Sequence, residues 1–214
     1  MTKELKDIFP QAQCWRTVPE FLVWYEKGVQ KLRLSVKELQ KEVLLRTRDS
    51  EQNPTAKRLS EEISPLYNVL KRIPEFASCK VKSNWGNQPF DVEIKGHPLF
   101  DRIEIVSATE NRDSAAERKR MLEEPEVTMK CTALDIANIA PIVDKIEKTI
   151  ERKKSKNYQG TYALIVSFNN ETILCPPYEK EFEKQIRIKN IQLGIFKKIF
   201  ITGETMEAEV LCLP

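Results

Sequence analysis

The sequence contains one histidine and six glycines, and each shortage excludes a class of chemistry. A Ser-His-Asp or Cys-His nucleophilic site would have to use His97, which stands in a Gly-His-Pro turn and is poorly placed for a rigid general base. The glycines form neither Gly-x-Gly-x-x-Gly nor a P-loop, which disfavours nucleotide binding by those routes. We therefore expect His97 to be a surface residue of its turn.

Long apolar runs and paired cysteines are also missing. No run approaches the ~20 residues of a membrane helix, and Met1 to Asp7 lacks the apolar segment of a secretory signal. The five cysteines are scattered without any Cys-x-x-Cys pair, which disfavours a zinc ribbon or finger. These features predict a cytoplasmic protein with reduced, mostly buried thiols and no membrane contact.

The charge balance is close to neutral. A net charge of +3 on 214 residues means that a nucleic-acid partner would need a local basic patch. The length fits one domain, or one domain with a helical extension. We predict an N-terminal helical extension over residues 1–54 and an α/β domain over 55–214.

Apolar residues recur at spacings of three and four in several segments, which predicts amphipathic helices. The first runs from Pro19 to about Arg46 and is weakened locally by Gly28. The second covers about 56–73, where Pro65 should kink or split it. Three further helices are predicted at about 113–123, from a cap at Asp135 or Asn138 to about Lys154, and at about 179–192.

Two stretches give clear strand signals. Residues 90–106 read as a hairpin, because each half alternates apolar and charged side chains. Residues 162–168 are almost continuously apolar, which is typical of a strand covered on both faces. Other strands are predicted at about 78–82, 127–131, 197–202 and 207–213, and residues 1–17 read as irregular. This mixture predicts an α/β fold with a mixed central β-sheet flanked by helices.

The hairpin raises several carboxylates onto one face of the predicted sheet. Two carboxylates on neighbouring strands can chelate Mg²⁺, which prefers oxygen ligands. A metal so placed polarises a phosphodiester and generates hydroxide, so hydrolysis needs no histidine or cysteine nucleophile. The alternative is a solvated strand face with cross-strand ion pairs, for example Glu93 or Glu104 with Arg102 or Lys95.

The segment order resembles the restriction-endonuclease-like superfamily over roughly residues 56–168. A helix with glutamates is followed by Pro-Phe-Asp, a hairpin into Ile-Glu-Ile-Val-Ser-Ala, a helix and a strand. The family motif is Pro-Asp followed by Asp/Glu-x-Lys on the next strand, and Asp91 and Glu104 match its acidic positions. The resemblance implies an αβββαβ core, cleavage of DNA or RNA, Mg²⁺ or Mn²⁺ on Asp91 and Glu104, and Glu62 as a further catalytic acid.

The chain departs from this motif at two points. One residue separates the motif proline from Asp91, and Val106 stands where the family has lysine. Either a lysine from elsewhere substitutes, with Lys95 and Lys119 as candidates, or the active site is degraded. The rival match Glu93-Ile94-Lys95 has the Glu-x-Lys form but lacks an upstream aspartate at a suitable distance.

Two basic clusters are candidates for nucleic-acid contact. Lys119 and Arg120 lie in a predicted helix, and Lys153, Lys154 and Lys156 lie at a predicted helix end. Cations at a helix C-terminus also complement the helix dipole, so the second cluster needs no ligand to explain it. If both clusters flank the carboxylates, they would contact phosphates and give salt-dependent, sequence-independent binding.

Two functions from different classes follow. The first is a metal-dependent nuclease. The second is a catalytically inactive relative that serves as a nucleic-acid or protein interaction module, with the N-terminal helix contacting a protein partner or a second copy of the chain.

Overall fold

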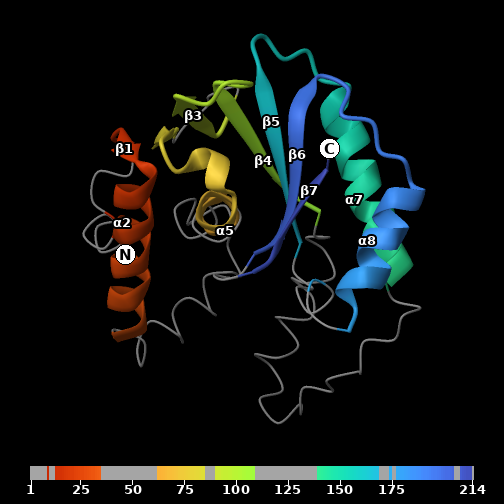
Figure 1. The fold of residues 1–214 in the computed structure, drawn as a ribbon, viewed down its shortest axis with the longest axis horizontal. Coiled ribbons are helices and arrows are strands. Elements are labelled where there is room, and N and C mark those ends of the chain that lie inside the picture. The colour runs from red at the N-terminus through yellow and green to blue at the C-terminus, as the bar shows by residue number, and fades with distance from the viewer. Residues whose placement is uncertain are drawn as a thin grey trace, which may run out of the picture.

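A computed structural model describes residues 9, 13–34, 62–84, 90–108, 139–168, 174, 177–204 and 208–213. These residues form a seven-stranded mixed sheet with helices on both faces (Figure 1). The predicted α/β class with a mixed central sheet is therefore confirmed. Within the described ranges, no helix is both long and apolar enough to cross a membrane.

The strands stand in the sheet in the order of the sequence. Neighbouring strands run antiparallel, except that β5 is parallel to both β4 and β6. Their bounds are β1 (Arg16–Thr17), β2 (Lys80–Ser83), β3 (Val92–Lys95), β4 (Arg102–Ser107), β5 (Tyr162–Phe168), β6 (Phe196–Gly203) and β7 (Val210–Leu213). Each described strand except β1 overlaps a segment for which a strand was predicted. The prediction of an irregular segment before the first helix is wrong at β1, which forms by pairing with β2.

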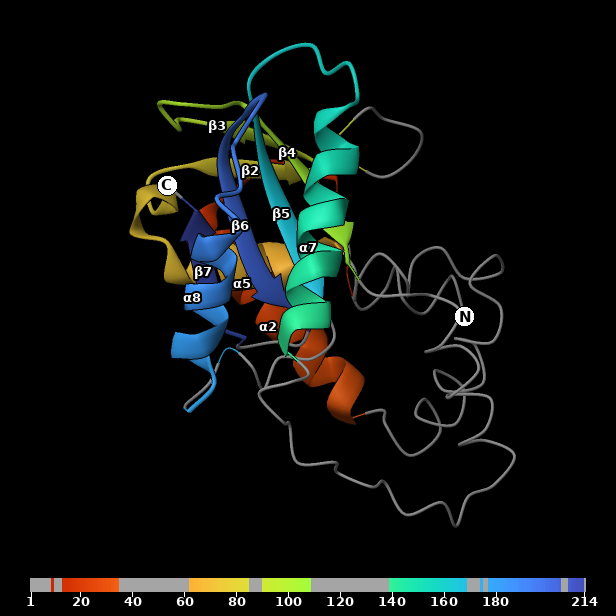
Figure 2. The ribbon, with the colours of Figure 1, turned by 90° about the vertical axis from the view of Figure 1, so that its right-hand side faces the viewer.

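Helices cover the sheet in two layers. One face carries α2 (Val18–Leu34), α5 (Ser64–Arg72) and the single turn η2 (Pro74–Phe76), and the other carries α7 (Ile139–Lys154) and α8 (Glu179–Ile188) (Figures 1 and 2). Pro65 lies in the first turn of α5, where its missing amide costs nothing, and the α-helix begins at Ser64 after a π-helical turn at 62–63. Pro141 similarly lies in the first turn of α7. The predicted elements at 35–46, 56–61, 113–123 and 127–131 lie outside the described residues.

The sheet separates two hydrophobic cores, and β5 belongs to both. Ala163 and Ile165 point into the core beneath α2 and α5, while Leu164 and Val166 point into the core beneath α7 and α8. All seven residues of β5 are buried, which confirms the prediction of a strand covered on both faces. The N-terminal helix α2 shares its core with α5, so it packs as part of the same body as the sheet.

A close approach in this first core explains a weak helix former in α2. The ring of Phe9 lies against Gly28, where an added Cβ would stand 2.1 Å from the Phe9 Cε1 atom. Phe9 is only 2 % exposed, and its ring meets Trp24 edge-on at 5.3 Å between centroids. Glycine at position 28 is a weaker helix former than alanine, but its lack of a side chain allows the Phe9 ring to contact the helix backbone.

Candidate active site

The hairpin of β3 and β4 brings Asp91 to Glu104. Ile103 and Ile105 belong to the core beneath α2 and α5, so Glu104 between them faces the α7 layer. Asp91 directly precedes β3, and its amide donates to the carbonyl of Ile103 at 3.1 Å. Its carboxylate accepts a hydrogen bond from the amide of Ile105 at 2.7 Å. The Asp91 carboxyl group is therefore fixed over the part of β4 that carries Glu104.

Lys153, in the last turn of α7, donates a hydrogen bond from its ammonium group to the Glu104 carboxylate. Glu104 is 7 % exposed and Lys153 is 9 % exposed, so each ion replaces hydration that the other has lost. The lysine that contacts Glu104 therefore comes from α7, and not from the position of Val106 on β4. Lys153 is buried beside Glu104, and its predicted contact with nucleic acid stays a prediction.

A signal for this lysine exists in the sequence. The buried stripe of α7 consists of Ile139, Val143, Ile146 and Ile150, and Lys153 continues it at the next position of the same spacing. A charged residue on an apolar stripe is buried with its partner or not at all. The spacing therefore places Lys153 on the face of α7 that packs against the sheet, although the Lys-rich run around it is typical of an exposed helix end.

Tyr158 follows α7 and completes the site. Its half-buried side chain presents the hydroxyl to Glu104 without a hydrogen bond of good geometry. Burial first, and then the negative charges of Glu104 and Asp91, raise the pKa of the phenol well above its ordinary value. The hydroxyl therefore stays protonated at neutral pH and is available as a donor to an oxygen atom.

The other lysines of the predicted basic cluster differ in their surroundings. Lys156 is exposed and lies close to Lys153, whose positive charge is the largest cause that lowers the pKa of Lys156. Lys154 pairs with Glu151 at 2.6 Å, away from the carboxylates. The second predicted cluster, Lys119 and Arg120, lies outside the described residues.

Neighbouring charges on the hairpin follow the cross-strand pairing that charged strands favour. Glu93 accepts from Lys82 of β2 at 3.0 Å. Lys95, a candidate for the missing motif lysine, instead holds its ammonium group 4.2 Å from the ring centroid of Trp15. The lysine at Glu104 is therefore Lys153.

The donor set suits a small divalent cation. Among the described residues, no group of three or more His, Cys, Asp or Glu side chains could hold a metal. Mg²⁺, however, is commonly bound through one or two carboxylates, with water and substrate phosphate completing its shell. Asp91 and Glu104 are the two carboxylates of this stretch, and their part as metal ligands stays a prediction. Glu62 lies half-buried just before α5, the helix on the opposite face of the sheet from α7, and its part as a catalytic acid stays a prediction.

No protein-family model matches this chain, and neither does any curated protein or solved structure with which it was compared.

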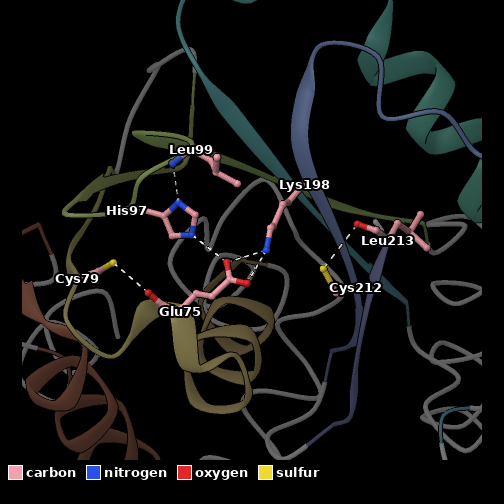
Figure 3. A network of polar contacts seen from close by, with 7 residues as sticks. All are labelled: Glu75, Cys79, His97, Leu99, Lys198, Cys212 and Leu213. Atoms are coloured by element: carbon pink, nitrogen blue, oxygen red, sulfur yellow. Dashed lines mark hydrogen bonds and ion pairs between the residues drawn. The ribbon is translucent and has the colours of Figure 1, made fainter.

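A second polar cluster surrounds the single histidine (Figure 3). The prediction of a surface residue is wrong: the His97 side chain is fully buried and its ring stacks on Phe100 with 3.9 Å between centroids. Its Nδ1 accepts a hydrogen bond from the amide of Leu99 at 3.3 Å, and its Nε2 lies 3.5 Å from the Glu75 carboxylate. Lys198 donates to both oxygens of Glu75 at 2.6 Å. These contacts tie β6 to the turn between β3 and β4.

This burial makes stability depend on pH. Desolvation, the largest cause, lowers the pKa of His97 below its ordinary 6.5, although Glu75 opposes the shift. The unfolded chain then binds more protons than the folded chain as pH falls through the ordinary histidine pKa of 6.5, so we expect the folded state to lose stability as pH falls below about 7. The measurement is the urea midpoint at each pH, compared with His97→Gln, whose curve should be flatter. Equal slopes for both proteins would refute the assignment to His97.

Proposed function

We propose that this chain is a metal-dependent nuclease that hydrolyses phosphodiester bonds in nucleic acid. The observation that carries the proposal is the buried Lys153–Glu104 pair beside Asp91. Two carboxylates and one lysine are the residue set of the restriction-endonuclease-like motif, and they gather at one point although the lysine comes from α7.

The order of the elements supports the same family of folds. A helix, α5, precedes the antiparallel strands β2, β3 and β4, and a helix, α7, then leads into β5, which runs parallel to β4. Among the described elements, this order agrees with the αβββαβ succession that the resemblance implies, and it supports the proposal of that core. We therefore propose that core for residues of the described α/β domain, with the catalytic hairpin at its centre.

Asp91 and Glu104 would hold Mg²⁺ or Mn²⁺. Such an ion supplies charge to a phosphoryl oxygen and lowers the pKa of its bound water. Lys153 neutralises one of the two carboxylates and keeps its ammonium at the edge of the ion site. The protonated hydroxyl of Tyr158 can donate to a phosphate oxygen. Lys153 and Lys156 are neighbouring cations that repel each other, and an anion between them would remove that repulsion.

The test is cleavage of supercoiled DNA, single-stranded DNA and RNA in the presence of Mg²⁺ or Mn²⁺. Asp91→Asn and Glu104→Gln keep the size of each side chain and remove its charge. Because a Lewis-acid ion contributes several kcal/mol to such reactions, we expect each variant to lose activity by about 100-fold or more. Cleavage that persists undiminished in Asp91→Asn would refute the assignment.

Glu93→Gln is the matched control. Glu93 lies on the same hairpin and is partly buried, but it pairs with Lys82 and is not part of the proposed site. We expect this variant to cut nucleic acid at the rate of the unmodified protein. An equal loss in Glu93→Gln would mean that general charge on the hairpin, and not the pair of Asp91 and Glu104, controls the activity.

The second candidate is the catalytically inactive module. Two observations favour it: Glu104 is already neutralised by Lys153, and the described residues offer no third ligand for a metal. This alternative predicts that the protein binds nucleic acid with an affinity that falls steeply with salt, and that it does not cleave it. It also predicts that calorimetric titration with Mg²⁺ releases no heat of binding. A protein contact through α2, where Val23 is 48 % exposed, belongs to the same alternative.

A further inference from the structure

A pocket of about 480 Å³ adjoins the carboxylates. It is enclosed by the loop after α7 and by residues at the entrances of β3, β4 and β5. Its lining consists of Phe90, Arg102, Lys156, Asn157, Tyr158, Gln159 and Tyr162. The volume lies in the range of roughly 300–1,000 Å³ that small-molecule sites occupy. The proposed reaction does not account for a pocket here, because hydrolysis needs only the carboxylates, the ion and a water molecule.

Three aromatic rings shape this pocket. Tyr162 is 2 % exposed, and Tyr158 and Phe90 lean against it with centroid distances of 4.8 and 6.3 Å. Phe90 meets Tyr162 nearly edge-on, at 70°. Phe90 and Tyr158 are only half-buried, so both keep surface that a planar ligand can cover. Aromatic side chains so arranged are the usual platform for an unstacked nucleobase.

The polar groups of the lining are two cations, two amides and the hydroxyls of Tyr158 and Tyr162, and no carboxylate lines the pocket. The Arg102 guanidinium lies 4.9 Å from the Phe90 ring centroid and 5.7 Å from that of Tyr162. It is held there by a hydrogen bond to the carbonyl of Gln159. Lys156 and the amide of Asn157 are exposed at the mouth. The pocket therefore suits a flat aromatic group carrying negative charge, which is the chemistry of a nucleotide.

The pocket and the carboxylate site share their boundary. Phe90 directly precedes Asp91, and Tyr158, which lines the pocket, presents its hydroxyl to Glu104. Within a duplex both faces of a base are covered by stacking, so a base can enter such a pocket only when it is unpaired or drawn out of the helix.

We infer that the pocket formed by Phe90, Arg102, Lys156, Tyr158 and Tyr162 binds one unpaired nucleotide, which makes single-stranded nucleic acid the preferred ligand of the site beside it. This inference rests on the proposed function for the meaning of that neighbouring site, but binding itself requires no catalysis. The base covers the aromatic rings, and the phosphate is met by Arg102 and Lys156.

The test is the binding of nucleic acid under conditions in which no cleavage can occur. The probe is a fluorescein-labelled single strand of roughly 12 nucleotides, as DNA and as RNA, and the same DNA strand as a duplex. Anisotropy is measured at low salt with EDTA, so that no divalent ion is present. We expect the single strands to bind more tightly than the duplex. Phe90→Leu, which keeps apolar bulk without the aromatic face, should weaken single-strand binding about 5- to 100-fold.

Lys156→Gln should weaken the same binding and reduce its salt dependence, whereas Lys180→Gln on the exposed surface of α8 should leave both unchanged. Thermal unfolding of each variant establishes that it folds. Equal affinity for the single strand and the duplex would refute the inference that the pocket binds an unpaired nucleotide. Unchanged binding in a folded Phe90→Leu variant would refute it as well. Strand binding that responds to both variants, together with no cleavage under any metal, would support the pocket and refute the nuclease. Cleavage that is lost in Asp91→Asn but unchanged in Phe90→Leu would support the nuclease and refute the pocket.

Discussion

Lys153→Met is expected to lower the free energy of unfolding by about 3–5 kcal/mol, because it leaves the buried Glu104 carboxylate without its partner ion. Methionine retains most of the length and apolar surface of lysine, so the loss reports the missing charge more than a cavity. The measurement is the urea midpoint and its slope, followed by circular dichroism at neutral pH. A loss below about 1 kcal/mol would mean that water reaches the pair and that the pair behaves as a surface ion pair.

The double variant Lys153→Met with Glu104→Leu separates charge from packing. Exchanging both members of a buried ion pair for apolar residues of similar size is often neutral or stabilising. We therefore expect the double variant to recover most of the stability that Lys153→Met alone has lost. The same protein should bind no Mg²⁺ and cut no nucleic acid. A double variant as unstable as the single variant would show that the residues also pack in a way that their neighbours require.

Phe9→Ala is expected to cost about 3–5 kcal/mol, the usual range for removing a buried aromatic ring from a core. The ring makes contacts with Trp24, Tyr25 and the backbone at Gly28. It therefore fastens the chain before β1 onto α2. The measurement is again the urea midpoint, with Val23→Ala on the exposed face of the same helix as the control that should change little.

The effect of Gly28→Ala on stability should change sign with the residue at position 9. In the unmodified protein, Gly28→Ala puts a methyl group 2.1 Å from a ring carbon of Phe9, so the ring must shift and stability falls. In Phe9→Ala, the same change meets no ring and should stabilise α2 by about 1 kcal/mol through helix propensity. An alanine that is harmful in both backgrounds would mean that the space at Gly28 is limited by something other than Phe9.

Much of the fold was predictable because buried side chains recur at regular spacings along each strand and helix. The hairpin around Val92 and Ile103 and the strand at 162–168 were found from alternation and from a continuous apolar run. The end of α7 at Lys154 followed from its apolar stripe and its basic last turn. The two-residue strand β1 could not be found in this way, because it is defined by its pairing with β2 and is too short to show an alternation of apolar and polar residues.

The candidate site was predictable only in part. Asp91 and Glu104 were chosen from the resemblance of the hairpin to a known motif, and the fold brings the Asp91 carboxylate to the stretch of β4 around Glu104. Lys153 is 49 residues from Glu104 in the sequence, and only the packing of α7 on the sheet joins them. His97 was misjudged because its turn is polar, whereas its ring reaches inward to Phe100. Local composition describes a backbone position well and the direction of a long or aromatic side chain poorly.

The agreement between strand order and sequence order has a consequence for biosynthesis. Each strand of the described sheet pairs with the strand made just before it, so the sheet can extend in one direction as the chain leaves the ribosome. Asp91 and Glu104 are made early, but Glu104 meets Lys153 only after α7 has been made and has packed against the sheet. Ribosome-bound chains that end before and after α7 should therefore differ sharply in protease resistance at β4. Until that helix has been made, the nascent protein carries the Glu104 carboxylate without the lysine that balances its charge.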